Sequence, residues 1–232
     1  MDRFLREILA IGEENFEKIN KAKVAVIGLG GVGSFAAEAL ARAGVSNIVL
    51  VDGDKVDITN INRQLIALTS TLFKYKASVF KDRILDINPD AKVTQICEFL
   101  SKDNLIDYIT KDINYVIDAI DMISVKIDII CHCKANGIPV VSSMGTGNKL
   151  HPELFKVSDI YSTKKDPIAR VLRRELKKRG VDSLKVVYSD EDTAGRGIIS
   201  EKGSNKTGSI SFVPGVAGMI LASQVILDII DS

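Results

Sequence analysis

A glycine-rich turn between two apolar segments is the part of this sequence best suited to bind a ligand. Residues 23–27 read KVAVI, which favours a buried strand, and the turn GLGGVG at 28–33 leads into a helix-forming stretch at 34–43. Glycines there let backbone N–H groups approach a phosphate, and the helix N-terminus adds the positive end of its dipole. The turn therefore predicts a nucleotide site. The alternative is a glycine turn that binds nothing.

The residues after the next strand indicate which nucleotide binds. The apolar segment 47–51 ends in Asp52, at the distance from the glycines where a carboxylate accepts both hydroxyls of a ribose. The polar loop that follows holds Arg63, and Lys76 opens the next helix. Both cations are placed to meet triphosphate oxygens. An NAD enzyme needs no such pair, because the helix end already holds its pyrophosphate. The cations therefore favour ATP.

Two further carboxylates end a later strand. Residues 115–121 read YVIDAID, so Asp118 and Asp121 are expected at the carboxyl edge of the sheet, where open α/β sheets bind ligands. A carboxylate that faces a triphosphate usually holds Mg²⁺ through its oxygens. Taken singly, Asp118 could be a strand-end or helix-cap residue, and Arg63 or Lys76 a solvated side chain. Their joint order behind the glycine turn favours a common site.

Together these motifs resemble the E1-like adenylating family that includes ThiF, MoeB and the E1 activating enzymes. The matching residues are GLGGVG at 28–33, DGD at 52–54, NINRQ at 60–64, Lys76 and DAID at 118–121. The resemblance implies an E1-like (ThiF-type) fold, ATP and Mg²⁺ as ligands, and a homodimer in which Arg6 reaches the ATP of the partner subunit. It makes Arg63, Lys76 and Asp121 catalytic, with Arg63 the chief cation and Asp121 the metal ligand. The implied ATP-binding residues are Arg6, Gly28, Gly30, Gly31, Gly33, Asp52, Asp54, Asn60, Arg63, Gln64 and Lys76.

The second half of the chain carries a strongly basic helix. Residues 166–180 read DPIARVLRRELKKRG, with an N-cap aspartate, a proline in the first turn and a glycine stop. Residues 158–181, and 142–159 before them, resemble the tRNA threonylcarbamoyladenosine dehydratase branch of the family. The resemblance and the density of positive charge predict a tRNA-binding face, and the alternative is an ordinary solvated face. The expected tRNA contacts are Arg170, Arg173, Arg174, Lys177 and Lys178.

That branch implies a concrete reaction. The threonyl carboxylate of N6-threonylcarbamoyladenosine (t6A) in tRNA attacks the α-phosphate of ATP, and pyrophosphate leaves. The carbamoyl group's own nitrogen or oxygen then attacks the activated carbonyl and expels AMP, which gives cyclic t6A. Two alternatives stay open. One is adenylation of the C-terminus of a ubiquitin-like sulfur-carrier protein by the same site, and the other is a non-catalytic or NAD-binding module.

Composition and cysteines limit the remaining classes. The 232 residues, 46% of them hydrophobic, suit one α/β domain with an ATP-binding part at 1–150 and a tRNA-side part at 151–232. The net charge of +1 argues against a uniformly basic nucleic-acid binder. A cytoplasmic protein with no membrane span is expected, because Gln224 and Asp228 interrupt the one long apolar stretch.

The cysteines suggest neither zinc nor a sulfur relay. Cys97, Cys131 and Cys133 form no CxxC pair, so no zinc site is expected. Two of them fall in a helical pattern and are expected to be small buried side chains. Relatives in this branch can carry a later cysteine. The absence of one after Cys133 argues against a persulfide relay through it and leaves a sulfur-transfer partner protein as an open possibility.

Apolar segments predict strands and helices along the whole chain, and the two alternate regularly in its first half. Such alternation requires a Rossmann-like, doubly wound, mostly parallel sheet with helices on both faces. Strands are expected near 23–27, 47–51, 92–97, 115–118, 138–143, 154–160, 185–188 and 209–213. Helices are expected near 3–19, 33–43, 76–87, 102–110, 123–136, 166–180 and 214–230. Residues 189–208 are polar and glycine-rich and are expected to form a mobile loop.

Overall fold

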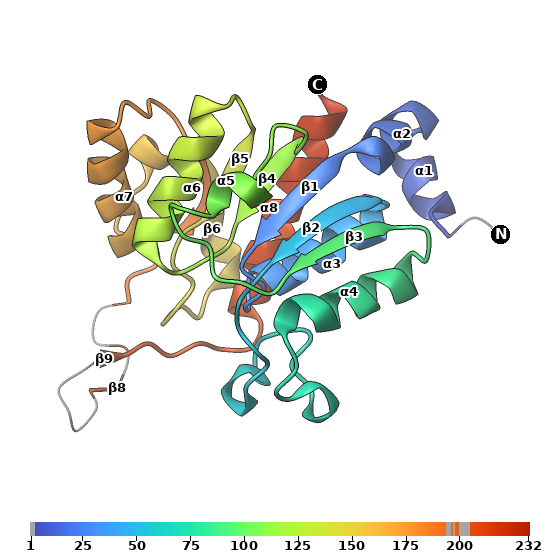
Figure 1. Ribbon diagram of the computed structural model, residues 1–232. Helices are drawn as coiled ribbons and strands as arrows, with labels where there is room; N and C mark the ends of the chain where they lie inside the picture. Colours follow the sequence, from blue (N-terminus) through green and yellow to red (C-terminus); the bar gives the residue numbers. More distant parts are fainter. Residues whose placement is uncertain (1–2, 194–195, 197, 200–204) are drawn as a thin grey trace.

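A seven-stranded sheet runs through the centre of the molecule (Figure 1). The computed structural model describes residues 3–193, 196, 198–199 and 205–232. The strand order is β3-β2-β1-β4-β5-β7-β6, and every neighbouring pair is parallel except β6 with β7. The strands are β1 (Lys23–Ile27), β2 (Asn47–Val51), β3 (Lys92–Ile96), β4 (Tyr115–Asp118), β5 (Val140–Ser143), β6 (Phe155–Asp159) and β7 (Lys185–Ser189). The predicted doubly wound, mostly parallel sheet is therefore confirmed.

Helices cover both faces of the sheet, because alternate residues of a strand point to opposite sides. In β1, Val24 and Val26 belong to the core on one face, whereas Ala25 and Ile27 belong to the core on the other. The first face is covered by α2 (Glu13–Lys21), α3 (Gly33–Ala43), α4 (Lys76–Ile87) and α8 (Val213–Ile230). The second face is covered by α5 (Leu105–Tyr108), α6 (Ile123–Ala135) and α7 (Pro167–Lys178).

The last helix, α8, packs in the core although its length and composition would also suit a membrane span. Half of its apolar stretch is buried inside the protein. Its carboxylate, Asp228, accepts hydrogen bonds from Tyr115 Oη (2.6 Å) and from Lys185 Nζ (2.6 and 2.7 Å). Burial, followed by the bond to Asp228, raises the pKa of Tyr115. The one charge in the helix therefore ties it to β4 and β7.

Three expected elements differ in the structure. The helix expected at 3–19 is two helices, α1 (Leu5–Ile11) and α2, because Gly12 takes a left-handed φ of +84° between them. The helix expected at 102–110 shortens to the single turn of α5. The strand expected at 209–213 does not form, since the carbonyl of Ser209 accepts a hydrogen bond from the Asn62 side chain and α8 already begins at Val213.

Short elements fill the connections. Part of the segment expected to be mobile, 189–208, lies outside the described residues, and the part inside includes β8 (Ile198–Ile199) paired antiparallel with β9 (Asn205–Lys206). Four single helical turns occur in the described loops. They are η1 (Ile58–Asn60), η2 (Thr69–Thr71), η3 (Pro152–Leu154) and η4 (Ile160–Ser162).

Candidate active site

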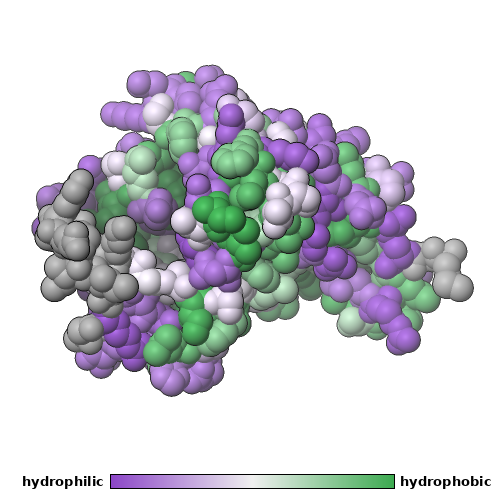
Figure 2. Space-filling view, turned by 90° about the horizontal axis from the view of Figure 1, so that it is seen from below, coloured by the Kyte–Doolittle hydropathy of each residue, from purple (hydrophilic) through white to green (hydrophobic). Residues whose placement is uncertain are grey.

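A cavity of about 400 Å³ opens at the carboxyl ends of β1, β2 and β4, where the strand order reverses between β1 and β4. Open α/β sheets bind ligands at such a point. Figure 2 views the molecule from this side, where hydrophobic and hydrophilic surface lie next to each other. The cavity wall contains most of the residues that the sequence singled out. They are Gly28, Gly30, Gly31, Asp52, Asp54, Asn60, Arg63, Gln64, Lys76 and Asp121.

The glycine turn has the geometry that its sequence predicts. Gly28 has a φ of +87°, which residues with side chains rarely adopt. A Cβ on Gly33 would lie 1.7 Å from the carbonyl oxygen of Gly28, so glycine lets α3 start close to β1. Gly33 packs behind the cavity and does not line it. The backbone N–H groups of Gly30, Gly31 and Val32 have no acceptor in the described part of the chain and are available to a phosphate.

Asp52 is held in one orientation at the end of β2. Its carboxylate accepts hydrogen bonds from the backbone N–H groups of Leu29 (2.6 Å) and Asp54 (2.8 Å), one on each oxygen. Each oxygen keeps a lone pair for a ribose hydroxyl. Burial raises the pKa of Asp52, and the charge of Lys76 and the two N–H groups offset part of that rise. Asp52 is therefore a preorganised acceptor.

Lys76 reaches the cavity from the first turn of α4. Its side chain is almost fully buried, and its Nζ lies 2.8 Å from Asp54 Oδ2. The backbone N–H of Lys76 also donates to the carbonyl of Asp54 (3.0 Å). An ammonium has three N–H donors, so its pairing with one aspartate leaves capacity for a phosphate oxygen. These two contacts fix α4 to the loop after β2 and keep the cation in the cavity wall.

Arg63 is anchored by one nitrogen and leaves its fork free. Its Nη1 donates to the carbonyl of Thr59 (2.7 Å) and to Asn62 Oδ1 (2.9 Å). These bonds use both hydrogens of Nη1, whereas Nε and Nη2 have no partner among the residues that the structure describes. The Nε–Nη2 edge of a guanidinium can bind two oxygens of one phosphate. Arg63 is therefore oriented by the protein and open to an anion.

Asn60 and Gln64 also line the cavity, with different surroundings. The side-chain carbonyl of Asn60 accepts the backbone N–H of Asp57 (3.0 Å), so this side chain shapes the loop at η1 and only its amide nitrogen stays available for a phosphate. Gln64 is buried, and its Oε1 has no hydrogen-bond partner in the described part of the chain. Orphaned buried oxygens are rare in folded proteins, and this one stands in a cavity wall.

The two aspartates after β4 do not share the site, which corrects the sequence interpretation. Asp118 still belongs to the strand and is fully buried, 2.8 Å from the ammonium of the equally buried Lys126. Ser142 donates to the same carboxylate (2.7 Å), and Lys126 donates to the carbonyl of Ser143 (3.0 Å). This cluster joins the ends of β4 and β5. Asp121 alone of the two aspartates lines the cavity, and its side chain is exposed.

The structure adds an apolar wall that the sequence interpretation missed. Phe99, Leu100 and Met122 line the cavity, and Phe99 is 65% exposed and Met122 56% exposed. The ring of Phe99 lies so close to Gly53 that a Cβ there would come within 2.7 Å of it. Large apolar side chains open to a cavity suit a flat apolar group such as a purine. Phe99 follows a strand with a mostly polar, exposed pattern, so no local signal in the sequence marked it.

The family model described as ThiF family matches residues 4–231, almost the whole chain. The chain belongs to the ThiF family. It is 43% identical over 242 residues to the tRNA threonylcarbamoyladenosine dehydratase of Bacillus subtilis, and this alignment covers 99% of this chain and 95% of that relative. The crystal structure of E. coli tRNA N6-threonylcarbamoyladenosine dehydratase, TcdA, in complex with AMP matches with a TM-score of 0.90 at 34% identity and covers 99% and 94% of the two chains. The same enzyme in complex with ATP matches with a TM-score of 0.89. The expected E1-like fold is confirmed.

The basic helix α7 of this ThiF-family protein divides its cations between structure and surface. Arg173 is half-buried, and its Nη1 donates to both the carbonyl (3.0 Å) and the hydroxyl oxygen of Thr163, so it fixes α7 to the turn before it. Arg170 and Lys177 are exposed and have no side-chain partner in the described part of the chain. These two are the cations of the helix best placed to meet an external phosphate.

The other cations of α7 gather around one carboxylate. Glu175 accepts hydrogen bonds from Arg179, Lys178 and Arg174, in that order of effect, and they lower the pKa of Glu175 to about 2. The helix holds five cations against Glu175, and Arg179 follows directly at its C-terminal end, so this segment is strongly positive. Positive charge is therefore concentrated on this helix, and Arg173 serves a structural contact, whereas the binding of tRNA by this face stays a prediction.

Arg6 lies outside the cavity of its own chain. It belongs to α1, which Figure 1 places near the amino ends of the strands, whereas the cavity lies at their carboxyl ends. Its side chain is exposed. Any contact between Arg6 and bound nucleotide would therefore have to come from a second copy of this ThiF-family chain.

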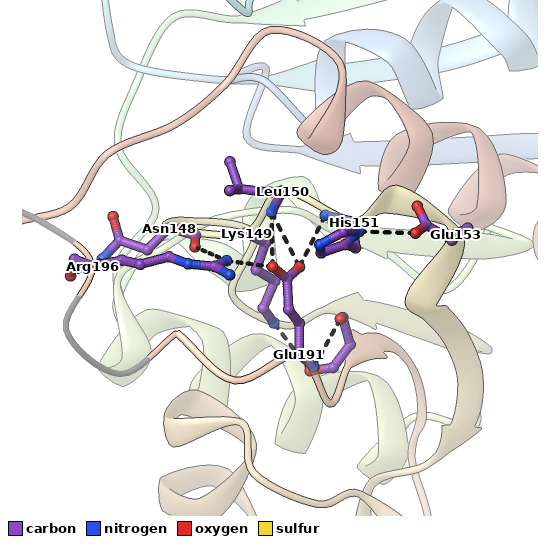
Figure 3. A network of polar contacts seen from close by, with 8 residues as sticks. Asn148, Lys149, Leu150, His151, Glu153, Glu191 and Arg196 are labelled. Atoms are coloured by element: carbon purple, nitrogen blue, oxygen red, sulfur yellow. Dashed lines mark hydrogen bonds and ion pairs between the residues drawn. The ribbon is translucent and has the colours of Figure 1, made fainter.

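A polar cluster fixes the loops of the second half (Figure 3). The carboxylate of Glu191 is buried and accepts the backbone N–H groups of Leu150 (3.1 Å) and His151 (3.0 Å) and a hydrogen bond from Arg196. Burial alone would raise the pKa of Glu191, but Arg196 and the two N–H groups lower it below its ordinary value. The loop after β5 is thus held to the segment after β7.

A buried lysine beside this cluster joins the same loop to α7. Lys149 Nζ lies 3.1 Å from Asp166 Oδ2 and donates to the carbonyl of Ser189 (3.1 Å). Asp166 is the N-cap of α7 and accepts the backbone N–H of Ala169 (2.9 Å). Because Thr146 of this loop lines the cavity, the lysine links the start of the basic helix to the cavity wall.

The cysteines and histidines form no centre of their own. The described residues contain no group of three or more His, Cys, Asp or Glu that could hold a metal ion. Cys133 is buried, as expected, and burial raises its pKa to about 12. Cys131 is half-buried, with its pKa also raised by burial. Both thiols are therefore protonated at neutral pH.

Proposed function

We propose that this protein is an ATP-dependent tRNA threonylcarbamoyladenosine dehydratase, which converts t6A in tRNA to cyclic t6A and releases AMP and pyrophosphate. The observation that carries the proposal is one cavity that combines the fixed carboxylate of Asp52, unpaired N–H groups of the glycine turn and the free fork of Arg63. That set fits a nucleoside triphosphate. Relatives that bear this enzyme name match the chain along nearly its full length, and one of them binds ATP.

The residues in the cavity wall support one orientation of ATP. The base packs against Phe99 and Met122, and the ribose hydroxyls donate to Asp52. The phosphates then lie over the glycine turn, within reach of Arg63 and Lys76. In this orientation the two cations would stabilise the negative charge that grows during attack at phosphorus.

In the first step, a carboxylate oxygen of the threonyl group attacks the α-phosphorus, and the bond from that phosphorus to the bridging oxygen of pyrophosphate breaks. The fork of Arg63 binds two oxygens of the phosphate undergoing attack, and the ammonium of Lys76 balances the departing charge. The products are an acyl-adenylate and pyrophosphate. The protein contributes position and charge and supplies no nucleophile.

In the second step, the carbamoyl nitrogen or oxygen of the same side chain attacks the activated carbonyl carbon. The bond from that carbon to the phosphate oxygen breaks, AMP leaves with one of the former carboxylate oxygens, and the attacking group loses its proton to solvent. The overall change is the loss of the elements of water from t6A, driven by cleavage of ATP to AMP and pyrophosphate. Both reacting groups belong to the substrate, which suits the protonated state of Cys131 and Cys133.

Mg²⁺ is proposed to accompany ATP, with Asp121 as its protein ligand. Mg²⁺ keeps several waters and is usually held by one or two carboxylates together with substrate phosphates. The exposed carboxylate of Asp121 in the cavity wall fits that requirement without a dedicated metal cage. The bound ion would neutralise part of the phosphate charge, and Asp121 would fix its place.

The second half is proposed to receive the tRNA. The exposed cations Arg170 and Lys177 would contact phosphates, and Lys149 with Asp166 joins this helix to the cavity wall. The working unit is proposed to be a cytoplasmic homodimer, in which Arg6 of one chain approaches the nucleotide of the other. The chain is proposed to act as a single domain whose parts, 1–150 and 151–232, serve ATP and tRNA.

The proposal is tested by incubating the protein with MgATP and tRNA that carries t6A, followed by mass spectrometry of the digested nucleosides. We expect cyclic t6A, 18 mass units lighter than t6A by loss of water, in amounts equal to the AMP formed. The matched control is the same tRNA without the threonylcarbamoyl group, which should yield neither product. ATP cleavage that depends on a ubiquitin-like carrier and leaves t6A unchanged would replace the proposal with the sulfur-carrier alternative.

A further inference from the structure

Asn62 connects two segments that are 147 residues apart in the sequence. Its Nδ2 donates to the carbonyl of Ser209 (2.8 Å), and its Oδ1 accepts from Arg63 Nη1 (2.9 Å). Both polar ends of the side chain are therefore engaged, although Asn62 itself is exposed. An asparagine that served only solubility would leave both ends to water.

The segment of residues 207–209, which connects β9 to α8, is called the strap. Its Ser209 is the partner of Asn62. In Figure 1 the chain that leads from β9 to α8 runs beneath the lower edge of the sheet, where the strands end. Ser209 of the strap lines the cavity. Thus one amide bridges the strap and the guanidinium of Arg63.

A second asparagine holds the other end of the strap. The backbone N–H of Asn148 donates to the carbonyl of Gly208 (2.8 Å), and the N–H of Gly208 donates to Asn148 Oδ1 (2.6 Å). Asn148 belongs to the loop that Glu191 and Arg196 fix, and Arg196 Nη1 donates to its carbonyl (3.1 Å). The strap is therefore bound at Gly208 by Asn148 of the second half and at Ser209 by Asn62, which also contacts Arg63.

We propose that Asn62 is a positioning residue that aligns Arg63 through the strap. An arginine side chain has large rotamer freedom, and Arg63 is held by Nη1 alone, at Thr59 and Asn62. The carbonyl of Thr59 lies in the same local loop as Arg63, whereas Asn62 connects the guanidinium to the distant strap. The Nε–Nη2 edge of Arg63 is aligned with the phosphate when the strap holds Asn62 in place. This inference rests on the proposed function.

The test is a kinetic comparison of Asn62→Ala with the wild-type protein, using MgATP and tRNA that carries t6A. A small misplacement of a charge-stabilising group mainly affects the transition state, so we expect kcat to fall about tenfold while KM for ATP changes less than about twofold. Asn62→Asp keeps an acceptor for Arg63 but cannot donate to Ser209, and we expect it to lose part of that rate. Asn136→Ala is the matched control, because it removes an asparagine hydrogen bond at the far end of α6.

The decisive arm repeats Asn62→Ala in an Arg63→Ala background. A residue that acts through Arg63 has no further effect once Arg63 is gone, so the double variant should match Arg63→Ala alone. A wild-type rate for Asn62→Ala, or a second tenfold loss in the Arg63→Ala background, would overturn the inference. If the wild-type protein itself forms no cyclic t6A, the proposed function is wrong, and the inference built on it is wrong as well.

Discussion

The ammonium of Lys76 lies 2.8 Å from Asp54 Oδ2, with the lysine side chain almost fully buried and the aspartate side chain 54% exposed. The buried partner is the cation that faces the cavity, and the exposed partner is its counterion. An arriving phosphate can therefore share or take over the role of Asp54.

Asp54→Ala tests this exchange of partners. Loss of the counterion leaves a buried ammonium, and because Asp54 is half-exposed we expect a cost of only about 1 kcal/mol, or a fall in Tm of about 2–4 °C. Saturating ATP should restore most of that loss, because its phosphates replace the carboxylate. Thermal melts with and without ATP measure the effect, with Asp82→Ala on the same helix as the control. An ATP-induced rise in Tm equal to that of the wild-type protein would contradict the exchange.

Arg63→Ala should abolish most adenylation while the fold stays intact. The lost charge-assisted contacts act mainly in the transition state, so we expect a cost of about 3 kcal/mol, roughly a hundredfold in rate. Formation of AMP from ATP in the presence of t6A tRNA measures the rate, and circular dichroism checks the fold. Arg42→Ala, which removes an exposed arginine of α3, serves as the control. Near-normal turnover of the Arg63 variant would remove Arg63 from its proposed role.

The binding of ATP should depend on pH through Asp52. Its pKa is raised by burial, so Asp52 becomes protonated at a higher pH than an ordinary aspartate as the solution is acidified. A protonated carboxyl loses acceptor strength for the ribose, and KM for ATP in the wild-type protein should therefore rise as pH falls through that raised pKa. Asp52→Ala should have a high KM throughout. Kinetics at several pH values give the ratio of the two KM values. A ratio that stays constant with pH would argue against Asp52 as the titrating group.

Asp121→Asn should change the use of metal more than the binding of nucleotide. An amide cannot supply the anionic oxygen that Mg²⁺ prefers, so we expect a higher Mg²⁺ requirement for turnover and little change in metal-free ATP affinity. Magnesium titrations of the rate, combined with ATP binding in EDTA, separate the two effects. Asp118 is no substitute control, because it is buried against Lys126 and its loss would damage the fold. Equal losses in both measurements would count against a metal role for Asp121.

Charge reversal on α7 should weaken tRNA binding. Arg170 and Lys177 are the exposed, unpartnered cations of the described helix, so their joint change to glutamate avoids the structural contact of Arg173. If both contact phosphates, the slope of log affinity against log salt should become shallower by about two units, while ATP binding is unchanged. The double variant Lys92→Glu and Lys111→Glu carries the same charge change on another surface. Wild-type affinity and salt slope in the α7 variant would make this helix an ordinary solvated face.

Local patterns were enough to predict the nucleotide half of the site. Gly28 and Asp52 follow strands directly, so their place at the sheet edge is set by residues next to them in the sequence. Asp118 and Asp121 show the limit of such reasoning. They are three residues apart, yet the first is still in the strand and is neutralised by Lys126, whereas the second is past the strand and open to the cavity.

Contacts made across the fold could not be predicted in this way. Phe99 lines the cavity because the loop after β3 packs against Gly53. Ser209 lines it because its carbonyl accepts a hydrogen bond from Asn62. Arg173 looked like its neighbours on a charged face, but its position at the edge of the buried face brings it to Thr163. Each of these placements depends on a segment distant in sequence, or on which side of a helix is covered. The composition of the segment itself does not contain that information.

The position of α8 against the sheet has a consequence for biosynthesis. Pro214 at its start lines the cavity, and Gly218 lies so close to α3 that a Cβ would come within 2.2 Å of the carbonyl of Val32. The glycine turn thus acquires its final support from a helix made about 180 residues later, or roughly ten to forty seconds later at ordinary rates of translation. Until then the nascent chain exposes the apolar side of α3 and cannot form a complete ATP cavity.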